Sequence, residues 1–194
     1  MNRSVRRISK IRRVIANRQD DLTVVMENVH DPHNVSAVLR TCDAVGILQV
    51  ELVYTTEKFP RIGKKSSSSA GKWVERRKHA SLDECYRTLR ASGMRIYAAV
   101  LDDKARSLYD IDCTAPVAFV FGNEHRGVSD DAAAGADGTF KIPMLGMIES
   151  LNISVACGIT LFEALRQRLR LDRFPPAPLD EKQQAELARQ WLQR

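Results

Sequence analysis

The stretch LTVVMENVHDPHNVSAVLRTCDAVG, residues 22–46, joins a strand pattern to a helix pattern across a short polar loop. Residues 22–26 are almost entirely apolar and rich in Val, which is typical of a strand buried on both faces of a sheet. Residues 35–45 repeat apolar side chains every three to four positions, which predicts a helix with Asn34 as its N-cap and Gly46 as its stop. A buried strand followed by a helix is the repeating unit of an α/β domain.

The same alternation continues toward the C-terminus and predicts one α/β domain over residues 21–169. Further short apolar runs predict strands at 48–54, 95–101, 117–121 and 139–142. Ser81 and Glu84 have capping-box spacing for a helix that ends at Gly93. We therefore expect a mostly parallel sheet with helices on both faces.

The last helix of this domain is expected at residues 151–169, with Ser150 as its N-cap. Its apolar positions predict a buried face made by Leu151, Val155, Ile159, Phe162 and Leu165.

Short helical extensions are expected at both ends of the domain. Residues 1–20 combine basic side chains with an apolar stripe that begins at Val5, which predicts an amphipathic helix that docks on another element. Residues 170–194 begin with the Pro-rich segment DRFPPAP and continue into a short helix that Asp180 caps and that ends near Leu192.

Positive charge is concentrated in two segments. The chain has 194 residues with 30 Lys and Arg against 24 Asp and Glu, a net charge of +6. Residues 1–20 carry +6 and residues 58–78 carry +7, so the rest of the chain is net acidic. The second segment contains a serine run and predicts a mobile loop. A solvated basic face explains either segment alone equally well, but the two together favour a nucleic-acid partner.

Several common functions lack their sequence signatures. The four cysteines are widely spaced, without a C-x-x-C pair, which predicts neither a zinc site nor a disulfide framework. The histidines have no metal-ligand spacing, so no metal is expected. Gly122 and Gly127 have P-loop spacing, but the phosphate-binding lysine is missing. The charged N-terminus leads into no apolar segment, and we expect a cytoplasmic protein without membrane spans.

Polar side chains gather in three loops that follow predicted strands. Ligands of parallel α/β sheets bind at the carboxyl ends of the strands. Each side chain also has a purely structural interpretation, such as a helix cap for Asn34 or an ion pair with Asp43 for Arg40. Their convergence favours one shared site. The candidate residues are Asn34, Arg40, Glu124, Ser150 and Asn152.

Three of these segments resemble the three motifs of the SpoU, or SPOUT, RNA 2′-O-ribose methyltransferases. They are NVSAVLRTCDAVG (34–46), FVFGNEHRGVS (119–129) and IPMLGMIESLNISVACGITLFEA (142–164), in the family's order. Within the family, the likeness is greatest to the members that methylate guanosine 18 of tRNA. The resemblance implies a deep trefoil knot formed after residue 117 and a homodimer with sites at the interface.

The resemblance also implies a cofactor and roles for individual residues. S-adenosylmethionine would contact the positions Ala99, Gly122, Ile142, Met144 and Leu151. Arg40 would be the key catalytic residue, supported by Asn34, Glu124, Ser150 and Asn152. The tRNA backbone would contact Arg6, Arg7, Arg12, Arg13, Lys64, Lys65, Arg166 and Arg168.

Alternatives remain open on the substrate and on the role of Arg40. A ribosomal RNA 2′-O-methyltransferase and a non-catalytic tRNA-binding module are the other hypotheses. A chain of 194 residues leaves no room for a separate RNA-binding domain beside the predicted one, which favours tRNA. Arg40 would act either as a perturbed base or as a cation that pairs with phosphate and stabilises the developing alkoxide.

Overall fold

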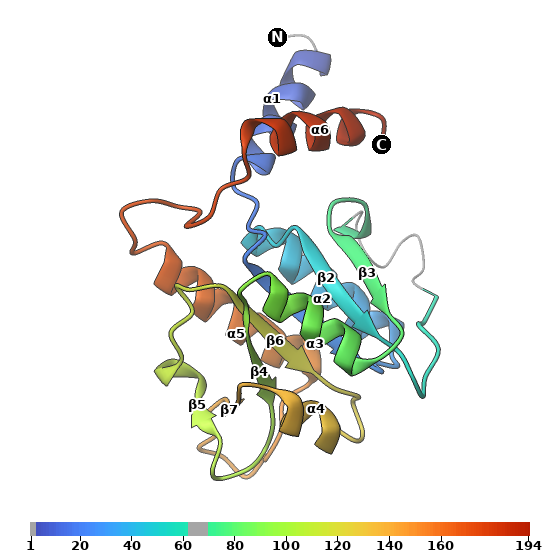
Figure 1. The fold of residues 1–194 in the computed structure, drawn as a ribbon, viewed down its shortest axis with the longest axis vertical. Helices are drawn as coiled ribbons and strands as arrows, with labels where there is room; N and C mark the ends of the chain where they lie inside the picture. The colour runs from blue at the N-terminus through green and yellow to red at the C-terminus, as the bar shows by residue number, and fades with distance from the viewer. Residues whose placement is uncertain (1–2, 62–69) are drawn as a thin grey trace.

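One seven-stranded sheet forms the centre of the protein (Figure 1). The computed structural model describes residues 3–61 and 70–194. The strand order is β3-β2-β1-β6-β4-β7-β5, and the six strand pairs of the described residues are all parallel. The strands are β1 (Leu22–Glu27), β2 (Gln49–Val53), β3 (Glu75–His79), β4 (Arg95–Ala99), β5 (Arg106–Ser107), β6 (Val117–Phe121) and β7 (Gly138–Lys141).

Helices cover both faces of the sheet, as predicted. The helices are α1 (Arg3–Ile15), α2 (Pro32–Val45), α3 (Leu82–Ala91), α4 (Asp130–Gly135), α5 (Ile153–Arg168) and α6 (Glu181–Leu192), with short 3-10 turns η1 (Ala70–Lys72) and η2 (Leu108–Asp110). On one face α2 and α5 pack against the larger apolar core. On the other face α3 and α4 pack against a second core. The strands β1 and β6 are buried along their whole length, which explains their apolar sequences. The implied knot stays a prediction.

The predicted loop at residues 58–78 is partly wrong, because its end forms η1 and the strand β3. The β3 sequence ERRKH has no apolar alternation, and its central residues are exposed. It is held by parallel pairing with β2 at the edge of the sheet, from Gln49 opposite Glu75 to Val53 opposite His79. Edge strands carry charged residues readily, so apolar patterning misses them. The predicted RNA contacts Lys64 and Lys65 lie outside the described residues.

Two predicted helix starts are also wrong. The α2 helix begins at Pro32, and its N-cap is Asp31, whose carboxylate accepts a hydrogen bond from the His33 amide at 2.7 Å. Proline is favoured at the first helical position because its missing N–H would have no helical partner there. The N-cap of α5 is Asn152 rather than Ser150. Asn34 and Ser150 therefore do not cap these helices, whereas Asn152, another predicted site residue, caps α5.

The face of α5 is less buried than its periodicity predicts. Val155 and Phe162 are 48% and 53% exposed, whereas Ile159 and Leu165 are half-buried against the larger core. The buried residues of α5 include Cys157, Leu161 and Ala164, which lie on another side of the helix. The helix therefore presents an apolar surface to the outside of this chain.

The two terminal helices pack against one another, far apart as they are in sequence (Figure 1). Ile11 and Ile15 of α1 form a small apolar cluster with Leu187 and Trp191 of α6. The predicted cap of α6 is confirmed, because Asp180 and Gln183 form a reciprocal capping box. The apolar stripe of α1 thus docks on the other extension.

Candidate active site at the carboxyl ends of the strands

The loops after β1 and β6 lie side by side because these two strands are paired in the sheet. The β1 loop leads into α2, the β6 loop leads into α4, and the segment after β7 leads into α5. Three of the predicted catalytic residues, one from each of these connections, are joined by direct hydrogen bonds. They are Asn34, Glu124 and Asn152.

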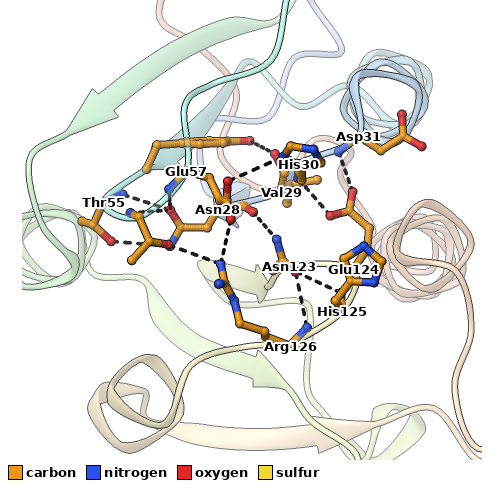
Figure 2. A network of polar contacts seen from close by, with 12 residues as sticks. Asn28, Val29, His30, Asp31, Thr55, Glu57, Asn123, Glu124, His125 and Arg126 are labelled. Carbon is orange, nitrogen blue, oxygen red and sulfur yellow. Dashed lines mark hydrogen bonds and ion pairs between the residues drawn. The ribbon is translucent and has the colours of Figure 1, made fainter.

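Glu124 is the acceptor at one end of this network, and Figure 2 shows it beside His30 and Asp31. Its Oε1 accepts hydrogen bonds from the Asn34 side-chain amide at 2.9 Å and the Asp31 backbone amide at 3.0 Å. Its Oε2 accepts one from the His30 backbone amide at 2.9 Å. Partial burial acts to raise the pKa of Glu124, but the hydrogen bonds from Asn34, His30 and Asp31 outweigh it and hold the pKa below its ordinary value. The group is therefore an anion at neutral pH.

The two asparagines form a relay with a fixed direction. Asn34 donates Nδ2 to Glu124, so its Oδ1 is turned toward Asn152 and accepts from the Asn152 Nδ2 at 3.0 Å. The Asn152 Oδ1 in turn accepts from the amide and hydroxyl of Ser154, at 2.8 and 2.6 Å. Because Glu124 can only accept, it sets the orientation of both amides. One N–H of the exposed Asn152 amide is left over for a ligand oxygen.

Two asparagines that the sequence analysis missed hold these loops in place. Asn28 has a positive φ of 50°, and its Oδ1 accepts from the backbone amides of residues 55, 56 and 57 at 3.0 to 3.1 Å. Asn123 donates Nδ2 to the Asn28 carbonyl at 2.8 Å and accepts from the His125 amide at 2.9 Å (Figure 2). Asparagine tolerates this backbone conformation and bonds to nearby backbone. Their only sequence signal is a place directly after a strand.

Arg40 and Ser150 are not part of the bonded network. Arg40 is exposed on α2, and no hydrogen bond or ion pair within residues 3–61 and 70–194 involves its guanidinium. The alternative interpretation of Arg40 as an ion-pair partner of Asp43 is wrong, because Asp43 pairs with the buried Arg18. Ser150 is exposed in the segment before α5. Both side chains are accessible to a ligand.

Three of the predicted cofactor positions lie at the carboxyl ends of neighbouring strands. Ala99 ends β4, Gly122 follows β6 and Ile142 follows β7, and these strands are adjacent in the order β6-β4-β7. Gly122 is required locally, because a Cβ there would come within 2.0 Å of the Gly127 carbonyl oxygen. The antiparallel bridge between Asn123 and Gly127 causes this close approach.

The other two positions, Met144 and Leu151, lie in the segment 143–151. No hydrogen bond among the described residues involves the backbone of this segment. Buried or ligand-facing peptide groups need partners, so these free amides and carbonyls can bind a polar ligand. The residues at 142, 144 and 151 in and beside this segment are apolar and half-buried. This donor set suits a nucleoside with an amino-acid tail, as in S-adenosylmethionine.

The predicted RNA contacts among the described residues divide into three groups. Arg6, Arg7, Arg12 and Arg13 are all exposed on α1. Arg166 is exposed and pairs with Glu163 at 2.7 Å. The prediction that Arg168 contacts RNA is wrong for this chain, because the residue is fully buried. It pairs with Asp21 at 2.5 Å and donates to the Cys113 carbonyl at 2.7 Å.

Two negative findings apply to the described part of the chain. No group of three or more His, Cys, Asp or Glu side chains there is placed to hold a metal ion. No helix there is long and apolar enough to cross a membrane.

The fold and this network define an α/β protein whose binding site lies in loops at the carboxyl ends of parallel strands. Residues 21–162 match the family described as the SpoU rRNA Methylase family. The match covers most of the chain, and the protein belongs to the SpoU methylase family.

Individual relatives show which members of this family the chain is similar to. The chain is 46% identical over 192 residues to the tRNA (guanosine(18)-2′-O)-methyltransferase of Thermus thermophilus, covering 99% of this chain and 98% of that protein. The crystal structure of the Aquifex aeolicus TrmH/SpoU tRNA modifying enzyme superposes with a TM-score of 0.91 at 35% identity, covering 98% and 96% of the two chains. The SpoU methyltransferase AviRb from Streptomyces viridochromogenes, in complex with the cofactor AdoMet, superposes with a TM-score of 0.68 at 28% identity, covering 81% and 62%.

Proposed function

We propose that the protein transfers a methyl group from S-adenosylmethionine to the 2′ hydroxyl of a ribose in tRNA, at guanosine 18. The observation that carries this proposal is the relay from Asn152 through Asn34 to Glu124, which joins all three family motifs. A module that only binds RNA has no need of such an arrangement. The Thermus thermophilus relative named for this tRNA activity matches the chain along nearly its whole length, which favours tRNA over ribosomal RNA.

The cofactor would supply an electrophilic methyl group on a sulfonium. Residues Ala99, Gly122, Ile142, Met144 and Leu151 would hold it, mainly through backbone groups of the β6 loop and the segment 143–151. The hydroxyl of a ribose is a weak nucleophile, so the protein has to position it and manage its proton.

The relay would position the ribose. Glu124 stays ionised and has three donors on its carboxylate, so it is not free to take a proton from the substrate. Its role is to fix Asn34, which fixes Asn152, whose remaining N–H can donate to a ribose oxygen. Ser150, exposed two residues earlier, would shape the same segment.

Arg40 would act as a cation. A guanidinium is too basic to lose its proton in proteins near neutral pH. The Arg40 side chain is exposed and has no acidic partner among the described residues, so it can pair with an RNA phosphate and stabilise a developing alkoxide. This role needs no perturbed base.

The protein would act as a homodimer in the cytoplasm. Val155 and Phe162 on α5 and Leu145, Met147 and Ile148 before it are large apolar side chains that are exposed in the single chain. Five large apolar side chains exposed within residues 145–162 favour an interaction site there. Three of them belong to the segment 143–151, so a second copy would complete the cofactor site.

The decisive experiment combines labelled S-adenosylmethionine with separate tRNA and ribosomal RNA pools and maps the methylated nucleotide. We expect label at guanosine 18 of tRNA. Arg40→Ala should lower turnover by at least about 100-fold while leaving cofactor binding unchanged. Arg87→Ala, which removes an exposed arginine of α3, is the matched control and should retain activity.

Three results would contradict the proposal. Label only in ribosomal RNA would favour the alternative methyltransferase. Tight tRNA binding without methyl transfer would favour a binding module. Near-normal turnover of Arg40→Ala would remove Arg40 from the chemistry.

A further inference from the structure

A basic cavity of about 620 Å³ lies beside the strands β4, β5 and β7. None of its lining residues belongs to the polar relay or to the predicted cofactor positions. Its walls include the first residues of β4 and β5 and the segments just before β5 and β7. The charged lining residues are Arg90, Arg95, Lys104, Arg106 and Asp137.

The single acid of the cavity is already neutralised. Asp137 pairs with Arg90 at 3.0 Å, and its other oxygen accepts the Ile96 backbone amide at 2.8 Å. Arg90 also donates to the Gly135 carbonyl at 2.6 Å. This pair therefore acts as a fixed part of the wall and leaves the net charge of the cavity to the other three side chains.

The remaining three cations have no protein partner among the residues that the structure describes. Across residues 3–61 and 70–194, no ion pair or side-chain hydrogen bond involves the charged groups of Arg95, Lys104 or Arg106. Three like charges that line one concavity repel each other and focus a positive potential into it. Phosphate relieves this repulsion best, because arginine binds its oxygens with two parallel hydrogen bonds.

We propose that the basic cavity binds a backbone phosphate of tRNA, away from the reacting ribose. This inference rests on the proposed function, because tRNA is the polyanion that the function brings to the protein. Arg95, Lys104 and Arg106 are all exposed, which suits a polymer lying across the surface. Small free ligands are usually buried on most of their surface, so a free nucleotide fits this open arrangement less well.

The test compares two double variants with the same loss of charge. Lys104→Gln/Arg106→Gln removes two cations from the cavity, and Arg87→Gln/Lys182→Gln removes two exposed cations outside it. Binding of unmodified tRNA is measured by filter retention over a range of salt concentrations, without cofactor. We expect the cavity variant to bind about tenfold more weakly at physiological salt and to show a salt slope smaller by one to two. The control should change affinity by less than about threefold.

A second measurement identifies the source of the phosphate. Inorganic phosphate and AMP are titrated into the native protein and the cavity variant, with binding followed by NMR shifts. Selective weakening of tRNA binding supports the proposal. Unchanged tRNA binding overturns it, and phosphate or AMP binding that is lost in the cavity variant would then assign the cavity to a free ligand.

The outcome is independent of methyl transfer. Thermal unfolding of both variants checks that the fold is intact. Because tRNA affinity is measured without cofactor, a protein that binds tRNA through the basic cavity but does not methylate it would overturn the proposed function and leave this inference standing.

Discussion

Glu124 sets the geometry of the site because it is the one member of the relay that can only accept hydrogen bonds. Its three donors are two adjacent backbone amides in the loop after β1 and the side chain of Asn34 on α2. Glutamine at this position would turn its own NH₂ toward some of these donors. The site therefore needs the negative charge of Glu124 as well as its shape.

This reasoning predicts a pH-dependent effect for Glu124→Gln. Removing the charged acceptor should lower the free energy of unfolding by about 1–2 kcal/mol at pH 7. Because the folded pKa of Glu124 is depressed, its contribution is fully present above the ordinary pKa of a carboxyl group. It is lost as the pH falls through the folded pKa. Urea unfolding of both proteins at pH 7, 5 and 3 should show the difference shrinking toward zero at the lowest pH, and an equal difference at all three would contradict the assignment.

Arg166 and Arg168 show that the burial of a single side chain could not be predicted from the sequence. Both follow the same basic pattern at the end of α5, yet Arg166 faces solvent and Arg168 is fully buried. The burial of Arg168 depends on Asp21 and on the carbonyls of Cys113 and Ala115, which come from distant parts of the chain. No local pattern predicts such a set of partners.

At the scale of elements, apolar patterning predicts the strands in the core of the sheet and misses the strands at its edges. The predicted strand at 117–121 matches β6 residue for residue, because every position of β6 is buried. The β3 strand is charged and the β5 strand has two residues, so neither carries a periodic signal. The error for α5 has the opposite sense: its periodicity predicts a buried side, but Val155 and Phe162 on that side are exposed in the single chain.

The exposed face of α5 gives a prediction about assembly. Phe162→Glu places a charge on a face that the proposed dimer buries, which should weaken dimerisation by at least about 100-fold, or about 3 kcal/mol. Sedimentation over a range of protein concentrations should show a shift from dimer to monomer, together with weaker cofactor binding. Leu192→Glu changes an exposed apolar residue of α6 and serves as the control. A native protein that is monomeric at every concentration would contradict the dimer.

At the scale of the whole molecule, the site exists only because the parallel sheet aligns the ends of its strands. The sequence could predict Asn34, Glu124 and Asn152 as a group, since all three follow strands and the strand pattern is strong. It could not predict which of them bond to each other, or that Arg40 stays outside the bonded network. Those depend on helix starts that shift by two or three residues and on the order β1-β6-β4-β7.

The terminal helices α1 and α6 also join distant parts of the sequence. We expect them to unfold locally as a unit while the sheet stays folded. Trp191 is almost fully buried, packs against Trp73 with ring centroids 5.0 Å apart and ring planes tilted by 59°, and lies under the guanidinium of Arg18. Trp191→Ala should destabilise the packing of α1 on α6 by about 3–5 kcal/mol. Because their shared cluster is distinct from the two cores of the sheet, amide hydrogen exchange should accelerate in α1 and α6 but not in β1 or β6.

The same variant separates RNA binding from cofactor binding. Loosening α1 disperses the exposed arginines that it carries, so tRNA affinity should fall while S-adenosylmethionine affinity is unchanged. Leu192→Ala, at the exposed neighbouring position, should alter neither exchange nor affinity. Equal losses of tRNA and cofactor binding in Trp191→Ala would mean that the terminal helices support the catalytic domain itself. The assignment of tRNA binding to the arginines of α1, apart from the cofactor site, would then be wrong.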